Sequence, residues 1–317
     1  MGPLSDAWPT LAELSQWCRH QLGSPVDRLL FTAGFRTQVS GLVLVDGRQV
    51  VTKVSGWTPR LRAAILVQRH VWAAGFPCPQ PLVGPLALGH HWIWAESLVA
   101  GGLPLTDDPR APELYAQALA ELVRRAPPAA SVPLLVPPPA WLHWDHPEAG
   151  LWPRREHVGN ENLNDRSDPP WLSEAAHRVR SRLASFEGPV VVGHGDWWSD
   201  NLRWIGEQLH VVFDWDSLTA RPEPGLAGAA AYMFAKTSFE LDGCAPGASV
   251  ECTEQFLDAY EQARGRRWSV AERQAAWAAG LWVAVFDARL SRCEDRGQGF
   301  ADLVRRDASE RLRRAGG

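Results

Sequence analysis

The residues best suited to chemistry lie in the stretch HGDWWSDN at positions 194–201. Asp196 is followed five positions later by Asn201, and an apolar run over 209–213 leads directly into Asp214. Transfer of a phosphoryl group from a nucleotide needs a carboxylate that orients the attacking hydroxyl, together with hard oxygen ligands for Mg2+. We therefore interpret Asp196 as a catalytic base and Asn201 and Asp214 as metal ligands.

Other interpretations of this stretch are open. Gly, Asp, Ser and Asn also favour turns, so the same residues could form a loop without chemistry. A chance match to HGDxxxxN in a chain of this length is on the order of one in a thousand, which favours the catalytic interpretation. His194 could be a base, but we favour a structural histidine that ties the loop together. A metal-dependent hydrolase with His194, Asp196, Asp214 and Asp216 as ligands is a competing class of enzyme.

Lysine occurs only twice in the chain, as Lys53 and Lys236. The pattern predicts a strand over 48–54, entered from a hairpin at Asp46-Gly47, a pair typical of a type I′ turn with positive φ at both positions. If the Lys53 face of this strand lines a cleft, the ammonium can pair with nucleotide phosphates, although a strand lysine that faces solvent is common. The hydrolase alternative would not need this lysine. The loop over 32–37 is a weak phosphate-binding candidate.

The remaining pattern describes the elements that must position these residues. The first hundred residues predict a small antiparallel sheet with a leading helix and one internal helix, over strands 28–31, 39–45, 48–54 and 91–98 and helices 11–22 and 60–74, with 79–87 as a loop or edge. The rest is mainly helical, over 112–125, 171–186, 252–264, 270–293 and 300–314. Strand-like stretches at 189–192 and 209–213 suggest a small hairpin inside the helical part. The fold class is therefore α+β.

Composition excludes several classes of protein. The 317 residues carry a net charge of -4, which gives no global positive field for nucleic acid. The longest apolar runs are too short to cross a membrane. The first 20 residues lack the apolar core of a secretory signal, so we expect a cytoplasmic protein. The five cysteines are widely spaced, which argues against a disulfide framework or a zinc site.

The motifs resemble those of the aminoglycoside phosphotransferase and choline kinase-like family. HGDWWSDN matches the HGDxxxxN loop of the family, FDWD at 213–216 matches its metal-binding segment, and Lys53 matches its nucleotide lysine. AGFPCPQPL and AESLVAGG resemble the stretch after the lobe helix and the hinge. The resemblance implies a two-lobed protein kinase-like fold that uses ATP and Mg2+. It also implies that the backbone at Glu96 and Leu98 binds adenine. The implied parts are an N-terminal lobe (1–95), a hinge (96–102) and a C-terminal lobe (103–317).

Two departures from the family pattern stand out. No Asp or Glu occurs between Asp46 and Glu96, so the helix carboxylate that normally pairs with the lysine is absent, and Gln68 is the nearest polar candidate. We therefore expect Lys53 to be less firmly positioned. Gly225-Leu226-Ala227 stands where the family commonly has an aspartate, so support for the loop around residue 194 must come from elsewhere.

The expected function is that of an ATP-dependent kinase that transfers the gamma-phosphoryl group to a hydroxyl of a small molecule. An aminoglycoside or another antibiotic or sugar-like acceptor is favoured, with a primary metabolite such as an amino alcohol as rival. A non-catalytic nucleotide-binding member of the family is a third possibility. The Trp-rich segment 126–170 could stack on an acceptor. An acidic acceptor cleft could be formed by Glu156, Glu161, Asp165, Asp168, Asp200, Glu240 and Asp242. The oligomeric state is left open.

Overall fold

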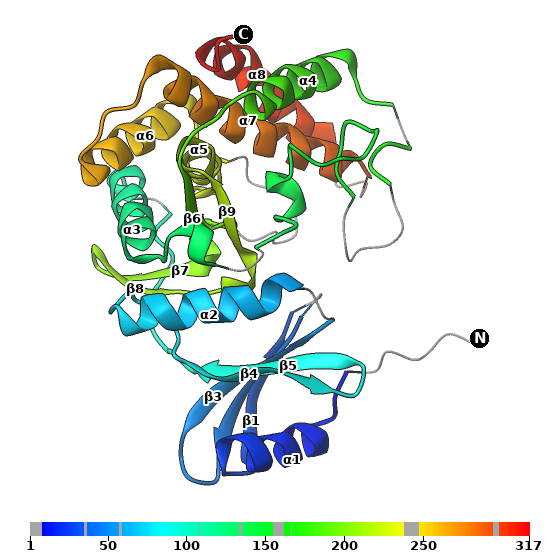
Figure 1. Ribbon diagram of the computed structural model, residues 1–317, viewed down its shortest axis with the longest axis vertical. Coiled ribbons are helices and arrows are strands. Elements are labelled where there is room, and N and C mark those ends of the chain that lie inside the picture. Colours follow the sequence, from blue (N-terminus) through cyan, green and yellow to red (C-terminus); the bar gives the residue numbers. More distant parts are fainter. Residues whose placement is uncertain are drawn as a thin grey trace.

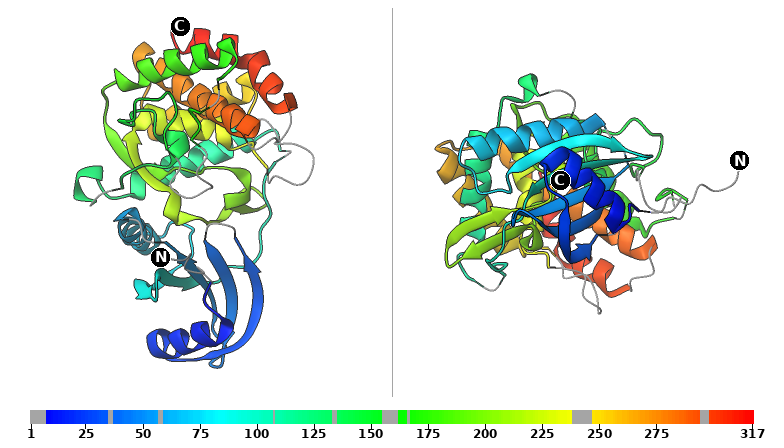
Figure 2. Two further views of the ribbon diagram at one scale, coloured as in Figure 1. Left: turned by 90° about the vertical axis from the view of Figure 1, so that its right-hand side faces the viewer. Right: turned by 90° about the horizontal axis from the view of Figure 1, so that it is seen from below.

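The computed structural model describes residues 8–34, 37–56, 59–106, 108–132, 135–154, 162–165, 167–237, 247–293 and 298–317. Figure 1 shows an N-terminal lobe built around a sheet and a larger C-terminal lobe built mainly of helices. Figure 2 shows the same division from the side, with the sheet at one end of the molecule and the late helices at the other. The two-lobed α+β fold predicted from the sequence is confirmed.

The N-terminal lobe is a five-stranded antiparallel sheet with the strand order β1-β2-β3-β5-β4. Its elements are α1 (Leu11–Leu22), β1 (Val26–Ala33), β2 (Gln38–Leu44), β3 (Gln49–Ser55), α2 (Pro59–Ala73), β4 (Pro81–Leu88) and β5 (His91–Ser97). Helix α1 begins at a capping box between Thr10 and Glu13. It buries Leu14 and Trp17 against apolar residues of the sheet. Strand β4 is the predicted edge.

The turn between β2 and β3 differs from the predicted type. Gly47 has a positive φ of 87°, but Asp46 does not, because Asp214 is the only non-glycine residue with positive φ in the described part of the chain. Gly47 N–H donates to the Leu44 carbonyl and Leu44 N–H donates to the Arg48 carbonyl. The connection is therefore a three-residue loop whose last residue is the left-handed glycine, and the type I′ prediction was wrong.

Helix α2 lies between the sheet and the C-terminal lobe (Figure 1). Leu61 and Ile65, on one side of it, pack against Trp94 of β5. Ala64 and Val67, on another side, belong to the main core of the molecule, which is otherwise formed mostly by the C-terminal lobe. Since both lobes hold this helix, it fixes the position of the sheet, and thus of Lys53, against the helical lobe.

The C-terminal lobe consists of six helices and two small sheets among its described residues. The helices are α3 (Ala111–Arg125), α4 (Pro170–Ala184), α5 (Glu223–Met233), α6 (Val250–Arg264), α7 (Val270–Cys293) and α8 (Gln298–Arg314). One sheet pairs β6 (Val190–His194) with β9 (Leu218–Pro222), and the other pairs β7 (Leu202–Ile205) with β8 (Gln208–Val212). The two predicted strands of this lobe are present but lie in different sheets, so they do not form one hairpin.

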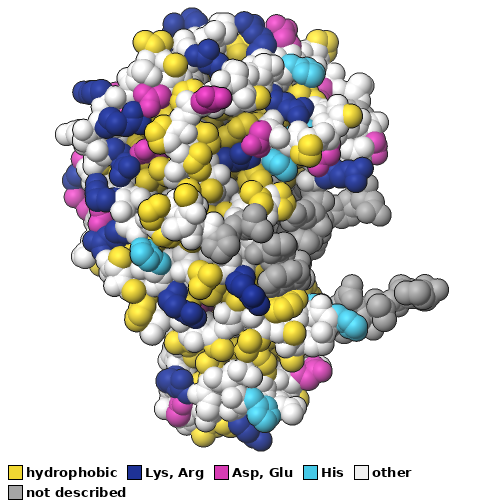
Figure 3. Space-filling view, in the orientation of Figure 1, with side chains coloured by type: hydrophobic (Ala, Val, Ile, Leu, Met, Phe, Trp, Pro, Cys, Tyr) yellow, Lys and Arg dark blue, Asp and Glu magenta, His cyan; other side chains and the backbone are white. Residues whose placement is uncertain are grey.

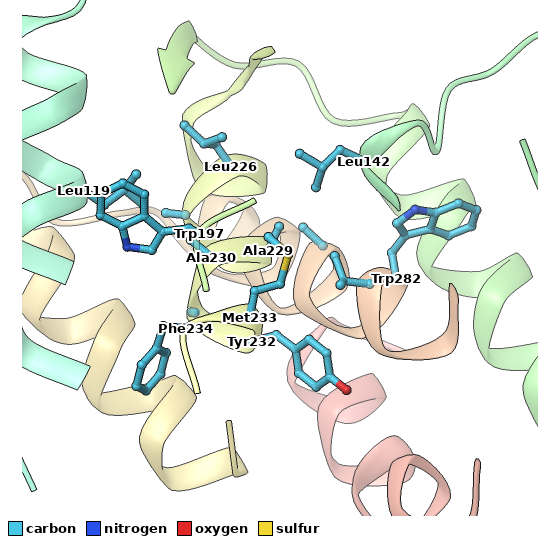
Figure 4. Packing of buried hydrophobic residues seen from close by; sticks show 14 of the residues in the cluster. Leu119, Leu142, Trp197, Leu226, Ala229, Ala230, Tyr232, Met233, Phe234 and Trp282 are labelled. Atoms are coloured by element: carbon cyan, nitrogen blue, oxygen red, sulfur yellow. The ribbon is translucent and has the colours of Figure 1, made fainter. Parts of the chain in front are cut away.

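Helix α5 is the centre of the lobe and was not predicted. Every residue of α5 is buried, which leaves no polar face and therefore no amphipathic period in its sequence EPGLAGAAAYM. A Cβ atom at Gly228 would overlap the carbonyl oxygen of Ala276 in α7, so glycine is needed for the two helices to approach. Figure 4 shows Leu226, Met233 and Phe234 of this region among the surrounding core side chains.

The Pro- and Trp-rich connection between α3 and α4 is largely irregular where it is described. It contains two single turns of 3-10 helix, at Ala129–Ser131 and Ala140–Leu142. Trp144 and Trp152 are buried in the main core, so the connection is packed rather than loose. None of the helices described here combines the length and the apolar character that crossing a membrane demands.

Candidate active site

Asp196 and Asn201 are joined by direct hydrogen bonds. The Asn201 side-chain amide donates to the Asp196 carbonyl oxygen at 2.9 Å and to its carboxylate Oδ2 at 3.1 Å. Burial raises the pKa of the Asp196 carboxyl to about 7, with the charge of Lys236 acting in the opposite direction and that of Asp214 adding to the rise. The two predicted residues therefore form one unit at the end of β6.

His194 is a structural residue of this loop. Its ring is buried, and burial lowers its pKa to about 4, so the ring is neutral at physiological pH. Nε2 lies 2.8 Å from the Phe213 carbonyl oxygen, while Nδ1 accepts the Asp196 backbone N–H at 3.2 Å. Both contacts are satisfied when the proton is on Nε2. The favoured interpretation of His194 as a tie between the loop and the strand before Asp214 agrees with this geometry.

Support for the loop comes from three other elements. The Trp141 indole N–H donates to the Gly195 carbonyl at 2.7 Å, and the Trp197 indole N–H donates to the Tyr115 carbonyl at 3.2 Å. Ser199 donates through both its backbone N–H and its hydroxyl to the Lys236 carbonyl. These contacts support the loop around residue 194 in place of the aspartate that the family commonly has near Gly225.

Asp214 is placed beside Asn201 by the pairing of β7 with β8. Phe213 N–H donates to the Asn201 carbonyl at 2.8 Å, which sets the next residue next to the loop. Asp214 has φ 59° and ψ 49°, in the left-handed region. A non-glycine residue held there is a form of strain that often occurs at functional sites. Its side chain is 53% exposed, so the carboxylate faces the space between the lobes.

Lys53 is buried on β3 and reaches the other lobe. Its ammonium lies 3.1 Å from Glu96 Oε1 and 3.7 Å from Asp214 Oδ1. Burial opposes the charge on the ammonium, but Glu96, Asp214 and Asp216 together raise its pKa above the ordinary value. The expected convergence of Lys53 with the residues of the C-terminal lobe is therefore present.

The expectation that Lys53 has no carboxylate partner was wrong. Glu96 supplies the partner from β5 instead of from α2, and Gln68 of α2 donates its amide to Glu96 Oε2 at 3.1 Å and to the Pro79 carbonyl at 3.0 Å. All three side chains are buried. Lys53 is paired with Trp94 across the sheet, and Glu96 follows two residues later on the same face. Lys53 is thus held firmly.

The hinge predictions concern the backbone at Glu96 and Leu98. Glu96 lies in β5, one residue before the end of the strand, and Leu98 directly follows the strand, at the junction of the two lobes. The Leu98 N–H donates to the Gln49 carbonyl at 3.1 Å, so this donor is already used in pairing with β3. Adenine binding by Glu96 and Leu98 stays a prediction, and it can use the Leu98 N–H only if that bond is broken.

The donor set fits a divalent cation such as Mg2+. The Asn201 amide nitrogen is used in the bonds to Asp196, so the amide oxygen of Asn201 is left as a hard ligand. Burial and then the charge of Asp214 raise the pKa of Asp216 to about 6, whereas the charges of Lys53 and Arg60 lower it. No group of three or more His, Cys, Asp or Glu side chains that could hold a metal alone is found among the described residues. Mg2+ commonly takes only one or two protein carboxylates and completes its shell with water and phosphate.

A cavity of about 350 Å³ opens beside Asp196, of a size suited to a small organic molecule. Its wall contains nine apolar residues, namely Pro137, Pro138, Pro139, Ala140, Trp141, Trp198, Met233, Phe286 and Leu290. Its polar residues are Arg60, His143, Glu148, Arg154, Asp196, Lys236 and Asp287. Lys236 and Asp287 form an ion pair of 2.7 Å. The Trp-rich segment 126–170, expected as a possible stacking surface for an acceptor, supplies Trp141 and much of this wall. Sequence reasoning missed the contributions of Met233, Lys236 and α7, for which the rarity of lysine was the only signal.

The three described acidic residues among those proposed for an acceptor cleft do not line this cavity. Asp168 pairs with Arg289 at 3.2 Å, away from the cavity wall. Asp165 and Asp200 are also absent from the wall among the residues that the structure describes. Glu156, Glu161, Glu240 and Asp242 lie outside the described residues. Figure 3 shows basic and acidic side chains interspersed on the face it draws, rather than collected by sign.

The site combines a buried lysine from one lobe with an Asp-Asn loop and a strand-end aspartate from the other. This combination is typical of a kinase-like phosphotransferase. The family described as "Phosphotransferase enzyme family" matches residues 43–223, more than half of the chain. The chain belongs to this family and is a small-molecule phosphotransferase. No curated protein sequence matches it.

Solved structures share the fold at low identity. An amicoumacin kinase in complex with AMP-PNP, Ca2+ and Ami is 10% identical, with a TM-score of 0.61, over 95% of this chain and 94% of that one. The macrolide 2'-phosphotransferase MphH from Brachybacterium faecium is 17% identical, with a TM-score of 0.58, over 94% and 98%. A choline/ethanolamine kinase family protein from Mesorhizobium loti is 16% identical, with a TM-score of 0.55, over 96% and 94%. At these identities the likeness shows the fold alone.

Proposed function

We propose that the protein is an ATP-dependent kinase that transfers the gamma-phosphoryl group to a hydroxyl of a small molecule. The observation that carries this proposal is the contact of 3.7 Å between Lys53 and Asp214, one from each lobe. It brings a phosphate-binding cation and a metal-binding carboxylate to the two sides of one space. The Asp196 carboxylate lies next to this space and lines the cavity for an acceptor.

Each residue has a separate duty in this proposal. Lys53 binds nucleotide phosphates and is oriented by Glu96. Asn201 and Asp214 hold Mg2+, which when bound neutralises the charge on the phosphates. Asn201 donates to Asp196 Oδ2, and this leaves Oδ1 to accept the proton of the acceptor hydroxyl. The backbone at Glu96 and Leu98 binds the adenine. An acceptor hydroxyl held at Asp196 is then placed for in-line attack on the gamma-phosphoryl group.

The non-catalytic alternative loses its main support. It rested on the absence of a carboxylate partner for Lys53, and Glu96 fills that role at 3.1 Å. Solved structures with this fold include an amicoumacin kinase, a macrolide 2'-phosphotransferase and a choline/ethanolamine kinase family protein, which suits a hydroxyl acceptor of moderate size.

The proposal is tested by nucleotide binding and by turnover. Calorimetry with the purified protein should show that ATP binds, that Mg2+ strengthens the binding, and that Asp214→Ala removes the Mg2+ effect. Release of ADP should then rise when a suitable hydroxyl acceptor is added. Absence of Mg2+-dependent ATP binding would overturn the proposal. Binding without any acceptor-dependent turnover in a broad screen would favour the non-catalytic alternative.

A further inference from the structure

We infer that the acceptor is a neutral molecule with an apolar face that presents two hydroxyl groups, one to Asp196 and one to the Lys236–Asp287 ion pair. This inference rests on the proposed function, since it concerns the acceptor of that reaction. It follows from the composition of the cavity wall, from the pairing of its charges and from the attachment of the ion pair to the catalytic loop.

The apolar part of the wall is extensive and rigid. Trp141, Phe286 and Leu290 come from the irregular connection and from α7, and they line the same cavity as Met233 of α5. The Trp141 ring is fixed because its N–H donates to the Gly195 carbonyl at 2.7 Å. Indole and phenyl faces bind the apolar face of a ring, and an acceptor that is hydrated on all sides would lose water here without compensation.

The charges on the described wall do not suit a polycation. Asp287 is neutralised by Lys236 at 2.7 Å, and Glu148 lies 2.7 Å from His146. Arg60 and Arg154 add positive charge to the same wall. The described wall thus has three basic side chains, Arg60, Arg154 and Lys236, against three acids, Glu148, Asp196 and Asp287, so it offers a ligand with several ammonium groups no excess of negative charge.

The ion pair is suited to a hydroxyl group. The Lys236 and Asp287 side chains are only 13% and 15% exposed, so they are held in a defined geometry. The ammonium has three N–H donors and the carboxylate has two oxygens, so after forming the ion pair they can still donate to and accept from one hydroxyl. An ammonium group at this place would have to compete with Lys236 for Asp287.

The ion pair and Asp196 keep a fixed relation. Ser199, three residues after Asp196, donates through its backbone N–H to the Lys236 carbonyl at 3.3 Å and also through its hydroxyl. The ion pair is therefore attached to the loop that carries the proposed base. Asp196, Lys236 and Asp287 line the same cavity. An acceptor that contacts Asp196 with one hydroxyl and the ion pair with another is held in one orientation, which selects the hydroxyl that is phosphorylated.

The test uses three matched glycosides with the protein saturated by Mg2+ and AMP-PNP. Phenyl β-D-glucopyranoside offers an apolar face and neutral hydroxyls, its 2-amino-2-deoxy counterpart adds one positive charge, and methyl β-D-glucopyranoside lacks the apolar face. Calorimetry should give the phenyl glucoside at least tenfold tighter binding than either of the others. Equal or tighter binding of the amino compound, or of the polycation kanamycin A, would overturn the inference, as would equal binding of the methyl glucoside.

Two variants separate recognition from folding. Lys236→Met leaves Asp287 unpaired and should reverse the preference, so that the amino glycoside binds tighter than the neutral one. The double variant Lys236→Met, Asp287→Leu replaces the ion pair by apolar side chains and should weaken the neutral glycoside at least tenfold without that reversal. The control Arg110→Met breaks an exposed ion pair with Glu207. It should change neither the affinity for the neutral glycoside nor the preference over the amino glycoside. An unchanged preference in Lys236→Met contradicts the inference.

The same samples distinguish this inference from the proposed function. Binding of Mg2+ and ATP is measured before any glycoside is added. If the nucleotide does not bind, the proposed function fails. If the nucleotide binds but the order of the glycosides is reversed, only the inference about the acceptor fails.

Discussion

The nucleotide side and the acceptor side of the site each contain one of the two lysines, and each lysine is paired with a carboxylate that is largely shielded from solvent. Lys53 lies 3.1 Å from Glu96, and Lys236 lies 2.7 Å from Asp287. The surroundings differ. Lys53 also has Asp214 at 3.7 Å and feels the charge of Asp216. Lys236 has one carboxylate in contact among the described residues, Asp287, and feels the charge of Asp196.

This difference corresponds to what each side is proposed to bind. Three carboxylates around one ammonium leave an excess of negative charge, which only a cation can offset. Such a region suits Mg2+ that arrives with phosphates. One carboxylate beside one ammonium is neutral, and it suits a ligand that brings hydroxyls rather than charge. Variants that remove residues from one side at a time test this division.

The largest effect is expected from Asp214→Ala. Removal of this carboxylate deletes a metal ligand and a partner of Lys53, so turnover and the Mg2+ dependence of ATP binding should both be lost. Asp214→Asn keeps one oxygen ligand and should retain part of the Mg2+ dependence. ATP titrations with and without Mg2+ measure this. A variant that keeps the full Mg2+ effect would remove Asp214 from the metal site.

Asp196→Asn should act on turnover alone. The amide cannot accept the proton of the acceptor hydroxyl, so turnover should fall on the order of a hundredfold or more, while Mg-ATP binding stays within a few-fold. ADP release with a phosphorylated acceptor, beside calorimetry with Mg-ATP, reads out both quantities. Wild-type turnover in this variant would show that the base is another residue.

Lys53→Ala tests whether only one of the two lysines binds the nucleotide. Loss of a hydrogen bond from a charged donor to the phosphates should weaken ATP use by about 1.5 to 3 kcal/mol in kcat/KM. Lys53→Arg keeps the charge but not the compact shape and should be intermediate. Lys236→Met should leave ATP binding unchanged. If both lysine variants weaken ATP binding equally, the division into two sides is wrong.

The two sides also differ in how well the sequence predicts them. Asp196, Asn201 and Asp214 lie within 19 positions of one another, so their spacing alone identifies the loop and the strand end. Lys53 could be placed because the strand period assigns it to a face. The acceptor wall instead combines segments around 140, 198, 236 and 287, which only the tertiary fold brings together.

Two misses, the role of Glu96 and helix α5, have the same origin. Glu96 was assigned to the hinge from the resemblance to the family. Its role as the partner of Lys53 was missed because the sequence does not reveal that β5 inserts between β3 and β4. That insertion puts Glu96 on the same face as Lys53. Helix α5 was missed because burial on all sides removes the polar face that sequence patterns detect. Strand order and complete burial are tertiary properties, and local periodicity does not carry them.

The smallest expected effect tests whether the contact between Gln68 and Glu96 acts as a unit. Gln68→Glu places a second carboxylate against Glu96 and removes the donor to the Pro79 carbonyl, so it should lower the free energy of unfolding by about 1 to 3 kcal/mol. Glu96→Gln leaves buried Lys53 with Asp214 alone and should cost a similar amount.

The double variant keeps the total charge and allows the amide at position 96 to donate to the carboxylate at position 68. It should therefore be more stable than the sum of the single losses implies, by at least about 1 kcal/mol, as coupled neighbours are. Urea unfolding of the four proteins measures this. Additive losses, within about 0.5 kcal/mol, would mean that Glu96 positions Lys53 without help from α2.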